Sequence, residues 1–237
     1  MTKQNLVEIK KGQVGTGLLI ENDGYVSIDM PQNRQLKESI GSKGTISPKD
    51  LPNPFIVSAV FQKYGVENAN GRVYPEDILK REVEKYQQAI AERRAYGECN
   101  HPSESSIDLG RLALNIVELH WEGHTLVGQM EIPISEGFRN LGVISCFSDM
   151  IAHWIISGLK VGVSSRALGS VRQQYGQLIV GDDLELVCWD AVSQPSTPGA
   201  WISMEPSELK QYVESEKKDG ELIKEDKFSK FDNWLND

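Results

Sequence analysis

Three kinds of polar side chain in this sequence could together catalyse acyl transfer, although they lie far apart along the chain. His101 lies in the segment GECNHP, next to a proline that restricts the backbone, and an imidazole can exchange a proton near neutral pH. Ser164 and Ser165 lie in GVSSRALG, and Asp190 lies in CWDAVSQPSTPGA. A hydroxyl, an imidazole and a carboxylate are the groups of a nucleophile, a general base and the acid that orients the base.

The alternation of side chains along a strand distinguishes the two serines. If GVSSRALG forms a strand, Ser165 shares the core-like face with Val163 and Ala167. Ser164 then lies on the other face with Arg166, which could stabilise a developing negative charge or pair with an acid. This alternation predicts Ser164, exposed on the polar face, as the nucleophile and Ser165 as its small buried companion. A Ser-Ser-Arg segment also occurs in strands without a catalytic function.

Asp190 is a charged residue in an otherwise apolar predicted strand. Burying a carboxylate costs several kcal/mol unless it is paired or hydrogen-bonded, so Asp190 needs a partner there. A histidine that becomes an imidazolium would be a suitable partner. The alternatives are a capping or turn aspartate at the end of a shorter strand and, for His101, a loop histidine without a catalytic task.

A zinc site is the other chemistry that the histidines could support. The four residues to consider are Cys99, His101, His120 and His124. A His-x3-His spacing is compatible with zinc, but Glu122-Gly123 between the two histidines predicts a hairpin rather than a helix face. The sequence also lacks a phosphate-binding loop and a G-x-G-x-x-G motif. We therefore expect no metal and no cofactor.

The elements that would position these residues are strands on either side of two helices. Strands are predicted at 55–62, 112–121, 125–134, 160–171 and 183–193, and helices at 75–94 and about 137–157. Residues 1–50 are expected to be loosely organised, with short apolar runs between Gly, Asn and Asp. This order of elements predicts an α+β fold with a largely antiparallel sheet.

Composition limits the classes of partner. The 237 residues carry 25 Lys and Arg against 34 Asp and Glu, a net charge of −9 that disfavours direct nucleic-acid binding. The longest apolar stretches fall far short of a membrane span, and the N-terminus lacks the apolar segment of a signal peptide, so we expect no membrane association and a cytoplasmic location. Three widely spaced cysteines favour reduced thiols over a disulfide framework.

Four motifs in a fixed order resemble those of a known family. They are NGRVYP (70–75), GECNHP (97–102), GVSSRALG (162–169) and a D-x-V-x-x-P-S-x-P run (190–198). Together they resemble the prohead core protein proteases of tailed bacteriophages, which share a fold with herpesvirus assemblins. The resemblance covers about residues 52–202. It implies a mostly antiparallel β-barrel flanked by helices, as in the assemblins.

The resemblance also implies an activity and a set of residues. Proteases of this family are serine endopeptidases that cleave scaffold and capsid proteins, and themselves, inside the immature phage head in the host cytoplasm. The family's histidine falls on His101 and its nucleophile in Ser164-Ser165, of which Ser164 aligns with the G-x-S pattern. Herpesvirus relatives use a second histidine as third member, but His120 and His153 lie outside the strand that follows the serine, so Asp190 is predicted instead. We also expect a homo-oligomer, and the backbone amides near Ser165–Arg166 are candidate oxyanion-hole donors.

The family is described as cutting after Leu or Ile, any residue, and Glu, with a small residue following the cut. The segment Leu-Lys-Glu-Ser at 36–39 matches this pattern, which predicts self-cleavage after Glu38 in the N-terminal segment. A second match ends at Glu136, where we expect folding to protect it. The resulting division is an N-terminal segment (1–50) that self-cleavage would remove, a protease domain (51–204) and an acidic flexible tail (205–237).

Two rival functions remain open. One is a non-catalytic scaffold or capsid component with a protease-like fold, because the presence of three catalytic residue types does not by itself show activity. The other is a zinc-dependent hydrolase built on the histidines and Cys99. Sensitivity to chelators and the activity of a variant without the Ser164 hydroxyl would separate these from a serine protease.

Overall fold

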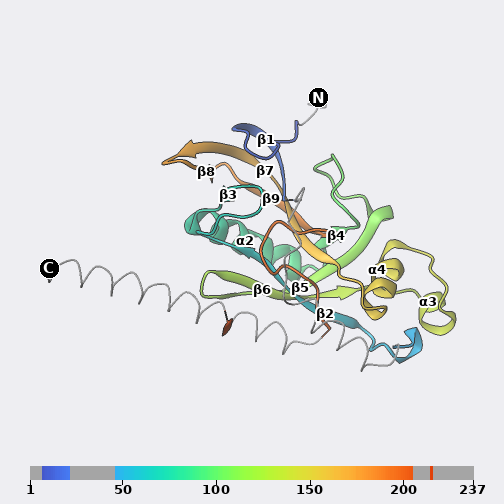
Figure 1. Cartoon of the computed structure of the whole chain (residues 1–237). Coiled ribbons are helices and arrows are strands. Elements are labelled where there is room, and N and C mark those ends of the chain that lie inside the picture. Colours follow the sequence, from blue (N-terminus) through green and yellow to red (C-terminus); the bar gives the residue numbers. More distant parts are fainter. Residues whose placement is uncertain (1–6, 22–45, 205–213, 216–237) are drawn as a thin grey trace, which may run out of the picture.

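The structure is a computed structural model that describes residues 7–21, 46–204 and 214–215 (Figure 1). Its strands are β1 (Gly15–Ile20), β2 (Phe55–Lys63), β3 (Arg72–Val73), β4 (Tyr96–Glu98), β5 (Leu112–Glu122), β6 (Thr125–Ile132), β7 (Gly162–Gln174), β8 (Gln177–Val180) and β9 (Glu185–Val192). Its helices are α2 (Glu76–Ala91), α3 (Glu136–Leu141) and α4 (Phe147–Ile156), with single 3-10 turns η1 (Pro48–Asp50) and η2 (Leu109–Arg111).

The strands form two sheets. One has the order β1-β7-β8-β3, with β9 also paired to β7, and the other has the order β2-β6-β5-β4. The pairs are antiparallel apart from β3 with β8. The predicted mixed α+β class with mostly antiparallel strands is therefore confirmed. The described strands do not form one closed barrel, so barrel closure stays a prediction.

The two sheets meet where β4 approaches β9. Cys99 forms a parallel bridge with Ala191, and the amide of Asn100 donates to the Ala191 carbonyl at 2.8 Å. Gly97 makes this approach feasible, because a Cβ at that position would lie only 2.1 Å from the carbonyl oxygen of Trp189. The junction carries the segment after β4, which contains His101, to the strand that contains Asp190.

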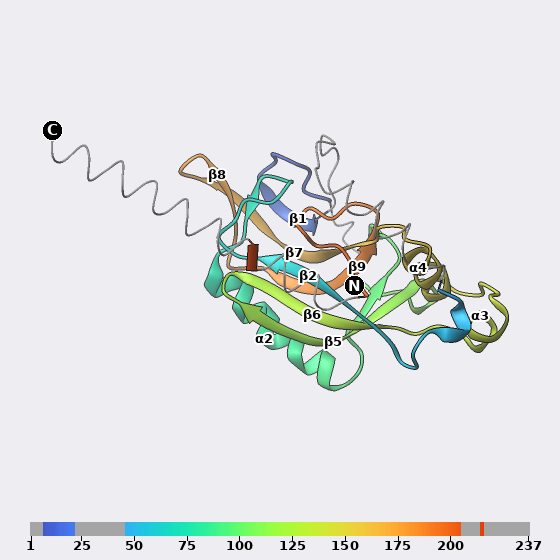
Figure 2. The same cartoon turned by 60° about the horizontal axis from the view of Figure 1, so that its bottom comes forward.

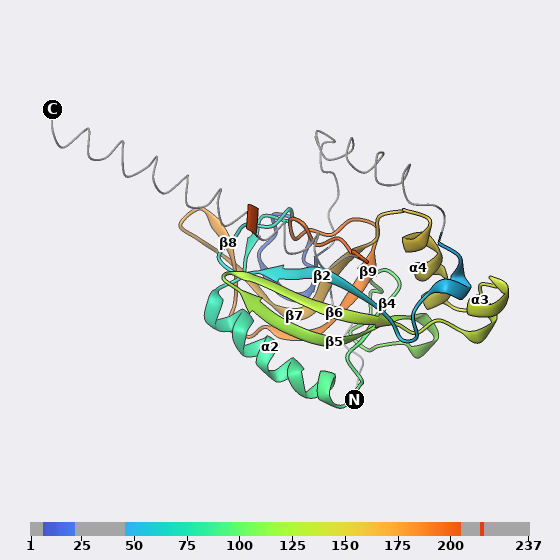
Figure 3. The same cartoon turned by 90° about the horizontal axis from the view of Figure 1, so that it is seen from below.

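Helix α2 agrees with the sequence prediction to within a few residues. Pro75 precedes its first turn, Glu76 and Asp77 lie near its positive end, and its apolar residues recur at helical spacing. The buried face packs on β5 and β9, and Figures 2 and 3 show the helix running along the outside of β5. The ring of Tyr86 meets that of Trp189 edge-on, with centroids 5.1 Å apart. Helix α2 thus supports the strand that carries Asp190.

The second predicted helix, at about 137–157, is wrong as a single element. The chain forms α3 and α4 instead, which lie together at one end of the molecule (Figure 3). Gly142 ends α3 in the left-handed conformation, with φ of 70°. The Asp149 carboxylate then accepts the amides of Ser135 at 2.7 Å and Ser145 at 2.9 Å, which fixes the turn between the helices. Within the described residues, no helix is long and apolar enough to cross a membrane.

Strand β1 lies in the segment that the sequence predicts to be loosely organised. It pairs antiparallel with β7, from Gly15 opposite Val171 to Ile20 opposite Arg166. Leu18 and Leu19 are buried. An alternation signal is weak in so short a run, because its glycines have no side chain to bury. The division at residue 50 stays a prediction, and β1 is the element that brings the N-terminal segment to the candidate site.

Candidate active site

The pairing of β7 with β9 places Ser164 directly opposite Asp190. Side chains of directly opposed residues in an antiparallel pair lie on the same face, with their Cβ atoms about 4.5–5.5 Å apart. Ser164 and Arg166 therefore share a face with Asp190, as the alternation of the sequence predicts. The expected exposure of Ser164 is wrong, because the residue is only 2% exposed.

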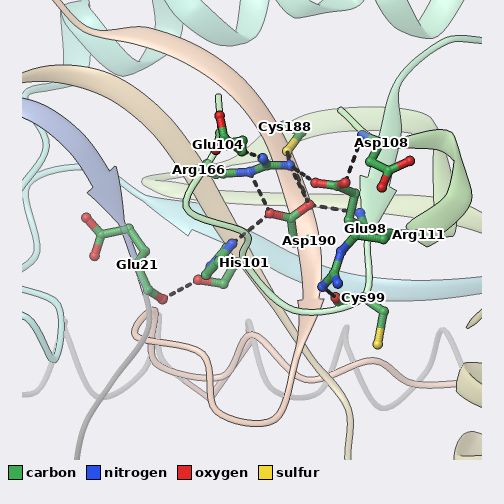
Figure 4. Close-up of polar contacts among 11 residues, drawn as sticks. Glu21, Glu98, Cys99, His101, Glu104, Asp108, Arg111, Arg166, Cys188 and Asp190 are labelled. Carbon is green, nitrogen blue, oxygen red and sulfur yellow. Dashed lines mark hydrogen bonds and ion pairs between the residues drawn. The ribbon is translucent and has the colours of Figure 1, made fainter. Parts of the chain in front are cut away.

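His101 contacts Asp190 from the segment after β4. Its Nδ1 atom lies 2.7 Å from Asp190 Oδ2, and the two side chains are 2% and 0% exposed (Figure 4). An ionised carboxylate can only accept, so this contact assigns the Nδ1 proton to His101 and leaves Nε2 as the acceptor in the neutral ring. His101 Nε2 is buried and has no hydrogen-bond partner among the described residues. The ring is thus in the tautomer of a general base.

Asp190 is buried, and each of its oxygens accepts hydrogen bonds. Oδ1 accepts the Glu98 amide at 2.8 Å, and Oδ2 accepts Arg166 Nε at 3.0 Å in addition to His101. Burial alone would raise the pKa of Asp190, but the hydrogen bond and charge of His101 and the charge of Arg166 outweigh it and lower that pKa. Asp190 is therefore held as a carboxylate that can stabilise an imidazolium.

Arg166 is paired with acids. Besides Asp190, its guanidinium contacts the Glu98 carboxylate and donates to the Glu104 carbonyl at 2.5 Å (Figure 4). Both Arg166 and Glu98 are fully buried. The two open roles for Arg166 are thus resolved geometrically in favour of the ion pair. The contact with Glu104 also ties down the loop that follows His101.

Arg166→Met is expected to lower the free energy of unfolding by about 3–5 kcal/mol, because two buried carboxylates would lose their counter-charge. Chemical denaturation of the purified variant measures this change. Adding Glu98→Gln to Arg166→Met removes one of the stranded charges and is expected to restore part of the loss. An Arg166→Met protein as stable as the wild type would contradict a structural role for this ion pair.

The two serines differ in what surrounds them. The Ser164 hydroxyl donates to the main-chain carbonyl of Glu21, the residue that follows β1. Ser165 faces the opposite side of β7, where Ala167 and Tyr74 belong to the second hydrophobic cluster. Only Ser164 therefore lies on the face of His101 and Asp190. The same Glu21 carbonyl also accepts the amide of Ser196, at 3.3 Å.

The histidines of the alternative zinc set contact different partners. His101 contacts Asp190, whereas His120 lies 3.1 Å from Glu118 and the ring of His124 faces Tyr64. Across residues 7–21, 46–204 and 214–215, no group of three or more His, Cys, Asp and Glu side chains is placed to hold a metal ion. Among the described contacts, His101 pairs with Asp190, and Ser164 lies opposite Asp190 in the pairing of β7 with β9.

Three participants in this arrangement had no assigned role in the sequence: Glu98, Glu21 and Ser196. Glu98 lies within the GECNHP motif and Ser196 within the D-x-V-x-x-P-S-x-P run, so the motifs included them without indicating a function. Glu21 lies outside all four motifs. Sequence reasoning could have found Glu21 only by predicting that residues 15–20 pair with the strand that contains Ser164.

The chain is similar to a known protein family and to proteins of bacteriophage T4. Residues 18–214 match the model of a family described as prohead core protein serine protease. The prohead core protein protease of Enterobacteria phage T4 is 34% identical over 156 residues, which cover 65% of this chain and 69% of that protein. The solved structure of the bacteriophage T4 capsid assembly protease gp21 is also similar, with a TM-score of 0.55 and 27% identity, over 75% of this chain and 98% of that one.

Proposed function

Because the chain belongs to the family of prohead core protein serine proteases, we propose that it is a serine endopeptidase with the triad Ser164, His101 and Asp190. The observation that carries this proposal is the 2.7 Å contact of His101 Nδ1 with Asp190, on the strand position opposite Ser164. The buried Nε2 atom of His101 is the acceptor that the Ser164 proton requires.

Each residue has one task in the proposed reaction. Ser164 Oγ attacks the scissile carbonyl while its proton passes to His101 Nε2. Asp190 keeps the ring in the correct tautomer and stabilises the imidazolium, which then donates its proton to the leaving amine. The Ser196 amide is a candidate oxyanion-hole donor, since it already donates to the carbonyl that contacts Ser164.

The proposed substrates are scaffold and capsid proteins of a phage, cleaved inside the prohead in the host cytoplasm. The two similar T4 proteins are named for a prohead core and for capsid assembly, which supports this substrate class. Cleavage after Leu or Ile, any residue, and Glu, self-processing and homo-oligomer formation complete the proposal.

We propose three parts of the chain. Residues 51–204 would form the protease domain, 1–50 the segment removed by self-cleavage and 205–237 an acidic tail. The predicted cut after Glu38 lies outside the described residues, as does the tail apart from residues 214–215.

A peptide assay tests this function against its rivals. We expect the purified chain to cleave the peptide RQLKESIG, which is residues 34–41, between Glu and Ser, at a rate that EDTA leaves unchanged. The same peptide with Leu36→Ala should be cut about tenfold more slowly, because an apolar pocket discriminates by one to a few kcal/mol. Loss of activity with EDTA would favour the zinc hydrolase, and absence of any cleavage would favour a non-catalytic shell component.

A further inference from the structure

The main chain of Glu21 lies against the catalytic serine. Its carbonyl oxygen accepts from Ser164 Oγ and from the amide of Ser196. Its own amide donates to the Ser165 carbonyl at 3.2 Å, which continues the antiparallel pairing of β1 with β7 by one residue. A peptide substrate of a serine protease is held in the same manner, with the carbonyl of the residue before the cut beside the nucleophile.

The side chain of Glu21 is fully buried in a pocket of hydrogen-bond donors. Its carboxylate oxygens accept from Asn68 at 2.6 Å, Asn70 at 2.8 Å, Arg72 at 2.8 Å, Tyr74 at 2.5 Å and Ser196 at 3.0 Å. Burial would raise the pKa of Glu21, but the charge of Arg72 and the donated hydrogen bonds outweigh it and lower that pKa. The pocket thus selects an ionised carboxylate of this length.

Arg72 is committed to the N-terminal segment. Besides Glu21, its guanidinium donates to the Ile20 carbonyl at 3.2 Å and to the Ile9 carbonyl, and the residue is only 1% exposed. Asn68 orients this part of the pocket, because its side-chain oxygen accepts the amides of Asn70 and Arg72, both at 3.0 Å. The segment NANGRVY (68–74) therefore supplies hydrogen-bond donors, one of them charged, to residues of the N-terminal segment.

Burial alternates along the three residues that end at Glu21. Leu19 is fully buried in the cluster that contains Tyr74 and Leu79, Ile20 is only partly buried, and Glu21 is fully buried. Along β7, an apolar pocket for Leu19 is followed by an outward position for Ile20 and by a pocket that binds the carboxylate of Glu21. This alternation is what an extended peptide bound at a sheet edge presents to its enzyme.

We propose that residues 15–21 occupy the substrate cleft as an internal substrate, that Asn68, Asn70, Arg72, Tyr74 and Ser196 form the glutamate-specificity pocket, and that the chain cuts itself after Glu21. This inference rests on the proposed function. Ser164 Oγ bonds to the Glu21 carbonyl carbon and the C–N bond to Asn22 breaks, with the proton moving from Ser164 to His101 and on to the Asn22 nitrogen. Water then hydrolyses the Glu21 ester, which leaves a free carboxylate and restores the Ser164 hydroxyl.

The first test is the mass of the fragments that the full chain releases on incubation. We expect a fragment that ends at Glu21 and a partner that begins at Asn22, formed at a rate independent of protein concentration. Glu21→Gln should slow this cut at least about 100-fold, since a buried pocket of five donors that includes the Arg72 charge rejects an uncharged isostere. Glu38→Gln is the matched control and should leave this cut unchanged. Processing only at other glutamates would overturn the inference.

The second test separates the pocket from the catalytic machinery. The probe is the peptide GTGLLIENDGYV, residues 15–26, together with its Glu21→Gln counterpart. The full-length wild-type enzyme should prefer the Glu peptide at least about 100-fold in kcat/KM. Tyr74→Phe, which keeps the shape of the side chain, should reduce that ratio about tenfold, and Arg72→Gln should reduce it further.

The outcomes distinguish the two levels of the proposal. If the enzyme cleaves peptides but the Glu-to-Gln preference is the same in wild type, Tyr74→Phe and Arg72→Gln, the pocket is wrong while the protease function stands. If the wild-type chain cleaves neither itself nor either peptide, both proposals fail. A Glu-to-Gln preference that falls in both variants supports the pocket.

Discussion

Ser164→Ala is expected to reduce peptide cleavage about 10⁶-fold, the largest effect of any single substitution in this protein. The hydroxyl is the group that would form the acyl-enzyme, and the described contacts offer no second hydroxyl on the face of His101 and Asp190. The side chain is small and buried, so removing one oxygen should leave the fold intact. Initial rates with an excess of peptide, alongside the thermal midpoint of the variant, measure the two effects separately.

Ser165→Ala is the matched control for this substitution. The residue is the neighbour of Ser164, equally small and equally buried, but its side chain lies on the other face of β7. We expect its activity to stay within about tenfold of the wild type. Activity retained in Ser164→Ala and lost in Ser165→Ala would show that the nucleophile has been assigned to the wrong serine.

Asp190→Asn is expected to lower kcat about 10⁴-fold with little change in KM. An asparagine amide would donate to His101 Nδ1, which forces the proton onto Nε2 and removes the base that Ser164 needs. The substitution preserves the volume of the side chain, so the loss should exceed any effect on folding. Single-turnover cleavage measured from pH 5 to pH 9 checks the prediction.

Glu98→Gln controls for the loss of a buried charge near Arg166. Glu98 pairs with the same guanidinium as Asp190 and is equally buried, but the described contacts of His101 are with Asp190. If the charge balance around Arg166 were the only requirement, both variants would lose activity to a similar extent. A much smaller loss in Glu98→Gln supports the orienting role of Asp190, and equal losses would contradict it.

Those parts of the fold that depend on local pattern could be predicted from the sequence. Helix α2 has an apolar face at helical spacing and a proline before its first turn, and the strands near 55, 112, 125, 162 and 185 are β-branched or apolar runs. The need of Asp190 for a partner also follows from elementary electrostatics, because an unpaired carboxylate in an apolar strand is too costly. The structure supplies that partner at 2.7 Å in His101.

The remainder depends on contacts between distant segments. The donors around Glu21 come from positions 47 to 175 residues further along the chain, so no local spacing could have grouped them. The burial of Ser164 could not be foreseen for the same reason, since the carbonyl that contacts it belongs to residue 21. The break between α3 and α4 depends on Gly142 and on a carboxylate that bridges two turns. Pattern alone treats that stretch as continuous.

The close approach at Gly97 makes the contact between His101 and Asp190 sensitive to the separation of the two sheets. Asp190 belongs to one sheet, while His101 follows β4 of the other, and only the missing side chain at Gly97 allows the backbones to meet at Trp189. Any force that wedges this seam apart by an ångström would lengthen the link between imidazole and carboxylate beyond hydrogen-bonding range. A wider seam would therefore break the contact between His101 and Asp190 without any change within either sheet.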